Sequence, residues 1–369
     1  MVSLRKEKVS SEKKILVRGK QTRNVILKYI TATLAVFCLS TFYQRIIVVD
    51  AVDTSGTFAG DTVRCALALD DDMFSRNLES GFCYEILNRF ADADNCSISV
   101  VPAGKTDYID SLRNGAVDIV ILPYKDTVMS GISFSREMDG TVWALRSGTL
   151  SHIREVNLWI SHFMNSEEYR ILDSRFRKTC NPYTKAEKGI VSRYISPYDN
   201  LIKKYAASMG WDWRMLAAVI YQESRFSINT SSSRGASGLM QVMPSTAEHY
   251  EISDLLDPEQ NIKAGTQHLI RLQRMFRNSD ISPEEQIKFV LAAYNAGEGR
   301  IEDCRKFAQF QNLDNTRWDE IVKAIPEMSD EELIRSSGLK FGKFNGKETV
   351  KYVDNVLEHY SVFCRICPA

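Results

Sequence analysis

The chain has 369 residues, which is ample for two or three domains with real hydrophobic cores. It carries 47 basic and 47 acidic residues, so its formal net charge is zero. This balance argues against a nucleic-acid-binding protein, which would normally show a basic surplus.

Residues 1–24 are polar and mostly basic, and an uncharged apolar stretch follows over residues 29–44. A positive flank before an apolar run indicates export with the N-terminus left inside. We predict a basic cytoplasmic tail over residues 1–24. Residues 25–50 are either a signal anchor or a signal peptide cleaved near Ala51, and both would export the rest of the chain. A buried helix of a cytosolic protein fits the one-sided charge less well.

Strands and helices alternate over residues 60–175. Apolar segments beginning at Val63, Cys96 and Val117 read as strands, and the segments 81–91 and 108–114 between them read as helices. Because the connecting loops are short, this alternation predicts a parallel or mixed α/β sheet.

A polar connector, residues 173–189, separates this part from a second half, residues 190–369, that is nearly all helix. One helix is expected to end at Gly210, and another to run from Asp257 to about residue 277, with apolar residues at helical spacing that form core. The predicted fold class is therefore α+β multidomain, with an N-terminal α/β lobe followed by a mostly helical domain.

A carboxyl group lies at the end of an apolar helix in this second half. Asp212 is a good N-cap, the run 215–220 is wholly apolar, and Glu223 follows where the helix meets a polar loop. A carboxyl group held partly away from water keeps its proton to higher pH, as a general acid must. An exposed helix-end glutamate is the alternative interpretation.

Two neighbouring segments have side chains suited to sugar binding. In the first, Gly235 and Gly238 allow a close approach of the backbone, Leu239 and Met240 offer apolar surface, and Gln241 offers an amide. An ordinary tight turn with core side chains is the alternative.

The second segment, residues 289–297, is an apolar helix that closes on a glycine and places Tyr294 and Asn295 at its polar end. A buried tyrosine with a satisfied hydroxyl is the alternative here.

Three motifs occur in order: Glu-Ser-x-Phe from Glu223, Gly-Ala-Ser-Gly-Leu-Met-Gln-x-Met-Pro from Gly235, and Ala-Ala-Tyr-Asn-Ala-Gly ending at Gly297. Together they resemble the catalytic domain of the Slt-type lytic transglycosylases, which are lysozyme-like enzymes that cut peptidoglycan. The resemblance covers residues 190–369 and implies a lysozyme-like domain there.

A fourth element of that family is a tyrosine in a Glu-Thr-Arg-x-Tyr-Val context. Residues 348–353 match it and point to Tyr352, although Val350 replaces the arginine.

The α/β segment, residues 60–175, resembles the amino-acid-type periplasmic solute-binding fold that precedes the catalytic domain in the membrane-bound family F enzymes. Only about twenty residues separate Leu122 from Trp143, where a two-lobed binding protein inserts a whole second lobe. We therefore expect a single lobe with a scaffolding or regulatory role, whose ligand or protein partner is unknown.

The resemblance implies that Glu223 is the catalytic residue and that peptidoglycan glycan strands are the substrate. The residues it implies for substrate binding are Ser224, Ser237, Gly238, Leu239, Met240, Gln241, Tyr294, Asn295 and Tyr352.

Ordinary glycosidases use two carboxylates, but the matched motifs offer only Glu223. A single acid suffices if the acetamido group of N-acetylmuramic acid attacks its own anomeric carbon. The resemblance implies that Glu223 first protonates the glycosidic oxygen and then takes the proton of the C6 hydroxyl, giving a 1,6-anhydromuramoyl end without water.

Two other functions remain open at this point. A goose-type muramidase would need a further acid to activate water, such as Glu251, Asp254 or Asp257. A non-catalytic peptidoglycan-binding or sensor protein would have little reason to keep an acid against a core.

Eight cysteines suit an oxidising envelope, and Cys83 with Cys96, and Cys304 with Cys364 or Cys367, are candidate disulfides. The Cys-x-x-Cys pair has no second pair or histidine cluster beside it, so we expect no metal site and no cofactor.

Overall fold

The computed structural model divides the chain into two compact units, residues 1–56 and residues 57–369. The residues that it describes are Lys28, Thr31 and Thr33, then 57–69, 74–101, 107–125, 128–148, 150–177, 179, 181–277, 280–330, 332, 333, 335 and 338–368. The predicted cytoplasmic tail, residues 1–24, therefore lies outside the described residues. Of the predicted signal segment, residues 25–50, only Lys28, Thr31 and Thr33 are described. Within the described part of the chain, no helix has the length and apolar character needed to cross a membrane.

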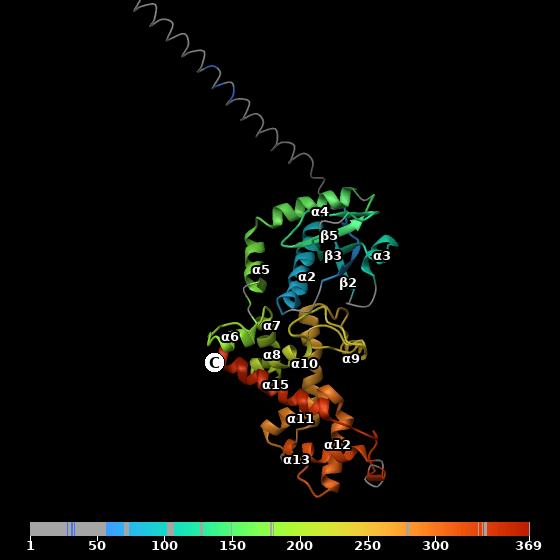
Figure 1. The fold of residues 1–369 in the computed structure, drawn as a ribbon, viewed down its shortest axis with the longest axis vertical. Helices are drawn as coiled ribbons and strands as arrows, with labels where there is room; N and C mark the ends of the chain where they lie inside the picture. Colours follow the sequence, from blue (N-terminus) through green and yellow to red (C-terminus); the bar gives the residue numbers. More distant parts are fainter. Residues whose placement is uncertain are drawn as a thin grey trace, which may run out of the picture. The chain divides into compact units, whose positions relative to one another are not determined.

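A five-stranded mixed sheet forms the first part of the second unit (Figure 1). Its strands are ordered β2-β1-β3-β5-β4. β1 is parallel to β2 and to β3, whereas β5 is antiparallel to β3 and to β4. The bounds are β1 Thr62–Leu67, β2 Ser97–Val101, β3 Ile119–Pro123, β4 Ile132–Phe134 and β5 Thr141–Arg146. The predicted mixed α/β sheet is confirmed, and the short β4 is an addition to it.

Helices cover both faces of this sheet. α2 (Phe74–Asp94) and α4 (Leu150–Phe163) pack on the face that carries the fully buried Trp143. α3 (Tyr108–Arg113) packs on the other face, against Ala66 and Ala144. β3 and β5 begin with three and five consecutive buried residues, and β1 ends with three, which explains why these stretches are apolar on both sides, as expected for a covered sheet.

The named elements in the remainder of the described residues are all helices, joined by loops (Figure 1). They are α5 Glu167–Arg177, α6 Pro182–Glu187, α7 Asp199–Met209, α8 Trp213–Ser224, α9 Pro244–His249, α10 Pro258–Met275, α11 Pro283–Ala296, α12 Glu298–Phe310, α13 Trp318–Ala324, the 3-10 helix η1 Ile325–Ser329 and α15 Lys347–Ile366. The predicted α7 does end at Gly210, which adopts a left-handed conformation with φ of 69°.

The sheet-bearing part and the helical part share one hydrophobic core. The Tyr198 side chain packs against the backbone of α2 at Gly81, where a Cβ atom would lie 2.0 Å from the Tyr198 hydroxyl oxygen. Two hydrogen bonds also join them: Asn229 Nδ2 donates to the Leu67 carbonyl at 3.1 Å, and Tyr84 Oη donates to Asp254 at 3.1 Å. The loops that follow α8 are therefore packed against the sheet-bearing part.

The candidate disulfides are not formed. Cys83, Cys96, Cys304, Cys364 and Cys367 are all free thiols in the structure. Cys83 and Cys304 are buried within α2 and α12, where they pack as small apolar side chains. Burial raises the pKa of the Cys304 thiol to about 12, which keeps it protonated.

Candidate active site

α8 places Glu223 at the junction between the core and a loop. Asp212 caps this helix by accepting a hydrogen bond from the Arg214 amide at 2.9 Å, as predicted. Residues 215–220 are all buried, so the helix lies inside the protein and its C-terminal end is fixed. Arg225 and Phe226 then adopt left-handed conformations with φ of 52° and 66°, so the helix ends at Ser224.

The Glu223 carboxyl meets a tyrosine from a distant helix. Tyr352 of α15 donates a hydrogen bond from Oη to Glu223 Oε1 at 2.5 Å. Burial raises the pKa of Glu223 to about 7, although the hydrogen bond from Tyr352 works in the opposite direction. A carboxyl group in this state can both give and take a proton near neutral pH.

Tyr294 belongs to the same group of side chains. Burial, and secondarily the charge of Glu223, raises the pKa of Tyr294 well above its usual value, so its phenol stays protonated. Its hydroxyl donates to the Met240 carbonyl at 2.7 Å. Three predicted site residues, Glu223, Tyr294 and Tyr352, therefore come together from α8, α11 and α15.

The glycine-rich segment folds as a tight loop against α10. Ser237 bridges to both Ser231 and Val242, and Gly238 has a φ of 79°. A Cβ atom at Gly238 would lie 2.2 Å from Asn261 Nδ2, so only glycine fits there.

Asn261 organises this loop, and sequence reasoning missed it. It is fully buried on α10, accepts a hydrogen bond from the Met240 amide at 2.8 Å, and donates to the Ser237 and Leu255 carbonyls at 2.9 and 2.8 Å. A polar residue among the apolar positions of the predicted helix was the available signal, because a buried amide needs partners.

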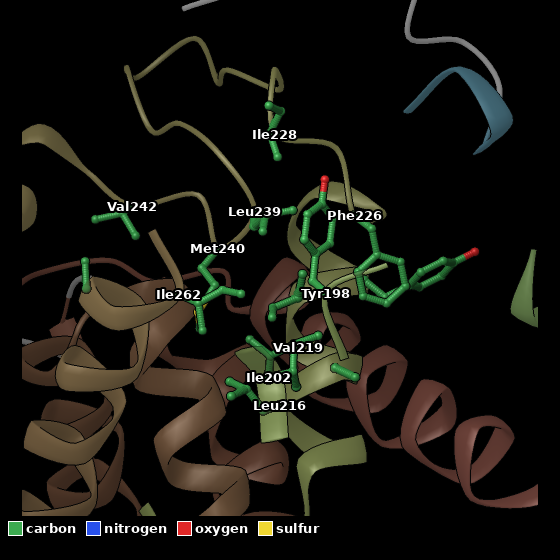
Figure 2. Close-up of a cluster of buried hydrophobic side chains, with 14 of the residues drawn as sticks. Tyr198, Ile202, Leu216, Val219, Phe226, Ile228, Leu239, Met240, Val242 and Ile262 are labelled. Atoms are coloured by element: carbon green, nitrogen blue, oxygen red, sulfur yellow. The ribbon is translucent and has the colours of Figure 1, made fainter. Parts of the chain in front are cut away.

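Leu239 and Met240 point into the core. Figure 2 shows both among buried side chains from α8 and α10, including Leu216, Val219 and Ile262. Both side chains are fully buried. Gly265 makes room for Met240, since a Cβ there would lie 2.4 Å from the Met240 sulfur.

The polar residues of the loop are engaged within the protein. Ser224 Oγ donates to the Leu239 carbonyl at 2.8 Å, which ties the end of α8 to the loop. Ser237 Oγ lies 3.3 Å from Ser231 Oγ. Gln241 has a φ of 47° and donates from Nε2 to the Thr230 and Gly238 carbonyls at 2.8 and 3.0 Å.

Asn295 is exposed at the end of α11. Its Oδ1 accepts a hydrogen bond from Thr349 Oγ1 at 2.9 Å. Because Thr349 lies almost one turn before Tyr352 on α15, this contact extends the group around Glu223 toward the beginning of α15.

A second link between α8 and α15 involves residues that the sequence did not single out. The imidazole of His359 contacts Gln222 Oε1 through Nε2 at 3.1 Å and the Tyr183 hydroxyl through Nδ1. Burial lowers the pKa of His359 to about 4, so the imidazole is neutral at pH 7. The spacing of seven residues between Tyr352 and His359 puts both on one face of α15, opposite Glu223 and Gln222.

The acids considered for a muramidase are placed elsewhere. Asp254 accepts from the Tyr84 hydroxyl at 3.1 Å, and Asp257 caps α10 by accepting from the Gln260 amide at 2.7 Å. Glu251 is exposed in the turn after α9.

Comparisons with known proteins identify what this chain is similar to. A family model for the transglycosylase SLT domain matches residues 200–316. Membrane-bound lytic murein transglycosylase F of Desulfosudis oleivorans is 31% identical over 225 residues, which cover 60% of this chain and 49% of that protein. The protein of the same name from Shewanella pealeana is 34% identical over 221 residues, covering 58% of this chain and 41% of the relative.

Among solved structures, the 70 kDa soluble lytic transglycosylase of Escherichia coli matches 59% of this chain and 31% of its own chain, with 26% identity and a TM-score of 0.33. The chain spans about half the length of the curated relatives it matches. The predicted resemblance to the Slt-type lytic transglycosylases is confirmed, and the match to the transglycosylase SLT domain extends over residues 200–316.

Proposed function

We propose that this chain is a peptidoglycan lytic transglycosylase that cleaves the β-1,4 bond between N-acetylmuramic acid and N-acetylglucosamine. One observation carries the proposal: Glu223, in a matched SLT domain, has a pKa near 7 and is held by Tyr352 at 2.5 Å. A general acid that later serves as a base needs this balance between its two protonation states.

In the first step, Glu223 gives its proton to the glycosidic oxygen as the bond from that oxygen to C1 breaks. The acetamido oxygen of the same N-acetylmuramic acid bonds to C1 and replaces the leaving sugar. In the second step, the Glu223 carboxylate takes the proton of the C6 hydroxyl, and O6 bonds to C1 while the acetamido oxygen leaves. The product is a 1,6-anhydromuramoyl end, and Glu223 regains its proton.

The residues around Glu223 would have different roles in substrate binding. Gln241, Asn295 and the Tyr294 hydroxyl would offer polar groups to the glycan, while Tyr352 would stabilise the carboxylate form of Glu223. Ser224, Ser237, Gly238, Leu239 and Met240 would keep the loop in shape, since their side chains or backbones are committed to internal contacts.

The hydrolytic alternative finds less support. Asp254 and Asp257 are hydrogen-bonded to Tyr84, and Asp257 also caps α10, so neither is disposed to activate a water molecule at Glu223.

For the sheet-bearing part we propose a scaffolding role, in a single lobe like that of solute-binding proteins. The support is the hydrogen bond from Asn229 to the Leu67 carbonyl and those from Tyr84 to Asp254 and Asp257, which hold the loops after α8.

We place the enzyme in the cell envelope, on the periplasmic side, anchored by its N-terminal segment or exported. The printed name of its relatives, membrane-bound lytic murein transglycosylase F, supports this location.

The test is mass spectrometry of the muropeptides released from purified peptidoglycan by the full chain and by its Glu223→Gln variant. Anhydromuramoyl ends that disappear in the variant are the expected result. Reducing ends would identify a hydrolase instead, and no release by the unmodified protein would leave a peptidoglycan-binding function.

A further inference from the structure

An exposed aromatic side chain lies in the segment that leads into α15. This segment, residues 338–346, is called the basic loop here because it contains Lys340 and Lys343. Phe341 at its centre is 53% exposed.

Two side chains of α12 hold the backbone of the basic loop. Asp303 is buried and accepts hydrogen bonds from the amides of Lys340 and Phe341, both at 2.8 Å. Arg300 donates from Nη1 to the carbonyls of Phe341 and Gly342, at 2.7 and 2.8 Å. A carboxyl group therefore binds backbone amides of the loop, and a guanidinium group binds its backbone carbonyls. Hydrogen bonds with a charged partner are stronger than those between neutral groups.

The Phe341 ring itself rests on the protein. A Cβ atom at Gly299 would lie 2.4 Å from Phe341 Cζ, so the ring can occupy its place only because residue 299 is glycine. The Arg300 guanidinium lies 5.7 Å from the ring centroid. The ring is supported by α12 on one side while half of its surface stays open to solvent.

The basic loop is connected to two helices that carry residues of the proposed site. It leads directly into α15, and the rise of about 1.5 Å per residue puts Tyr352 only about 7 Å along the helix from Lys347. Its other support, α12, begins just after Asn295, which contacts Thr349. Both anchors of the loop therefore adjoin residues proposed to bind the glycan.

The charges near Phe341 suit an acidic ligand. Lys340, Lys343 and Lys347 are exposed, and Glu348 is the exposed acid beside them. Each N-acetylmuramic acid carries a lactyl group whose peptide stem ends in carboxylates. An aromatic ring with nearby ammonium groups matches a sugar that has an apolar face and an acidic substituent.

We propose that the basic loop is a substrate subsite, in which the Phe341 ring packs against a sugar ring of the glycan strand next to the cleaved bond. Lys340 and Lys347 pair with carboxylates of its peptide stem. This inference rests on the proposed function, because it assigns a further part of the same substrate site.

The experiment measures binding and turnover separately. Binding of the full-length Glu223→Gln protein to insoluble peptidoglycan is measured by co-sedimentation, with and without Phe341→Ala. Turnover is measured with proteins that keep Glu223, with and without Phe341→Ala. Phe310→Ala is the matched control, because Phe310 is 51% exposed on α12 but lies outside the basic loop.

We expect Phe341→Ala to weaken binding about tenfold, which corresponds to about 1.4 kcal/mol, and to raise KM with little change in kcat. Phe341→Trp should restore binding, and Phe310→Ala should change nothing. Lys340→Gln with Lys347→Gln should weaken binding to intact peptidoglycan but not to glycan strands freed of peptides by an amidase.

Unaltered binding and KM in Phe341→Ala would overturn the subsite. Equal losses from Phe341→Ala and Phe310→Ala would also overturn it, because they would show a general surface effect. Failure of the proposed function looks different: the unmodified protein would then release no anhydromuramoyl products, whatever residue 341 is.

Discussion

At the scale of single residues, the proposed chemistry depends on two opposing effects on the pKa of Glu223. Burial raises its pKa to about 7, and the hydrogen bond from Tyr352 lowers it. The carboxyl is therefore close to half protonated at neutral pH, and removal of Tyr352 should shift this balance toward the acid form.

The Tyr352→Phe substitution tests this balance. Cleavage needs Glu223 protonated in the free enzyme, so kcat/KM should fall as the pH rises through about 7. Loss of the hydrogen bond should move this alkaline limb to higher pH and lower the rate of the step in which Glu223 is a carboxylate. The measurement is the pH profile of turnover. An unmoved alkaline limb would show that Tyr352 does not affect the titration of Glu223.

Gly238 and Gly235 offer a matched pair at the residue scale. A methyl group at Gly238 collides with Asn261 Nδ2 and the Leu255 carbonyl, whereas at Gly235 its nearest neighbour is 4.0 Å away. Gly238→Ala should therefore destabilise the protein by about 3 kcal/mol or more, through strain and a broken hydrogen-bond network. Gly235→Ala should cost about 1 kcal/mol, from its positive φ alone. Urea unfolding of both variants measures the difference, and equal losses would contradict the close packing at Gly238.

At the scale of elements, α8 and α15 together build the site. Tyr352 and His359 on one face of α15 reach Glu223 and Gln222 at the end of α8, so the register of the two helices sets the position of the acid. The neutral imidazole of His359 helps to fix this register, because its two nitrogens contact Gln222 and the Tyr183 hydroxyl.

His359 predicts a pH dependence of stability. Burial lowers its pKa from 6.5 to about 4 in the folded state, so below pH 6.5 the unfolded chain binds the proton more readily than the folded one. Its contribution to stability is therefore complete above about 6.5 and is lost as the pH falls toward 4. The loss is at most about 3.5 kcal/mol, since each unit of pKa corresponds to about 1.4 kcal/mol, and it is smaller where solvent reaches the imidazole.

Replacement of His359 should remove this dependence. The free energy of unfolding of His359→Gln should be lower at pH 7 but should fall less steeply than that of the unmodified protein between pH 6.5 and 4. The exposed His249→Gln serves as the control. Parallel curves for the unmodified protein and His359→Gln would exclude His359 as the group responsible.

At the scale of the whole molecule, the sheet-bearing part and the helical part of residues 57–369 share a core. Asn229 is buried and donates to the Leu67 carbonyl at 3.1 Å, so its loss leaves a buried acceptor without that donor. Such a change costs about 1–3 kcal/mol.

We therefore expect the two parts to unfold in one transition, and Asn229→Ala to lower its midpoint as a whole. Fluorescence of Trp143, in a variant whose other four tryptophans are replaced by phenylalanine, follows the buried core of the sheet, while far-ultraviolet circular dichroism follows the helices of both parts. Coincident curves from the two probes would support one cooperative unit. Separate midpoints, with only the sheet signal shifted by the substitution, would show that the parts unfold independently.

Most elements could be predicted from local patterns. The N-cap at Asp212, the apolar run before Glu223 and the stop at Gly210 are local signals, and they placed α7 and α8 within a residue or two. The alternation of apolar strands and helices also predicted the mixed sheet, although β4, with only three residues, is too short to show a pattern.

The sequence by itself determined which residues are proposed to carry the chemistry, because each of the motifs around Glu223, Gly235 and Tyr294 is contiguous and its residue types are suited to an acid and its sugar. Only the tertiary structure decided how these residues are used. In the structure, Leu239 and Met240 are core residues, and the candidate disulfides are not formed. Asn261 and His359 position the loop and the end of α8 through hydrogen bonds. The physical reason is that burial and hydrogen-bond partners depend on contacts between residues far apart in the chain, such as Glu223 and Tyr352, which no local pattern contains.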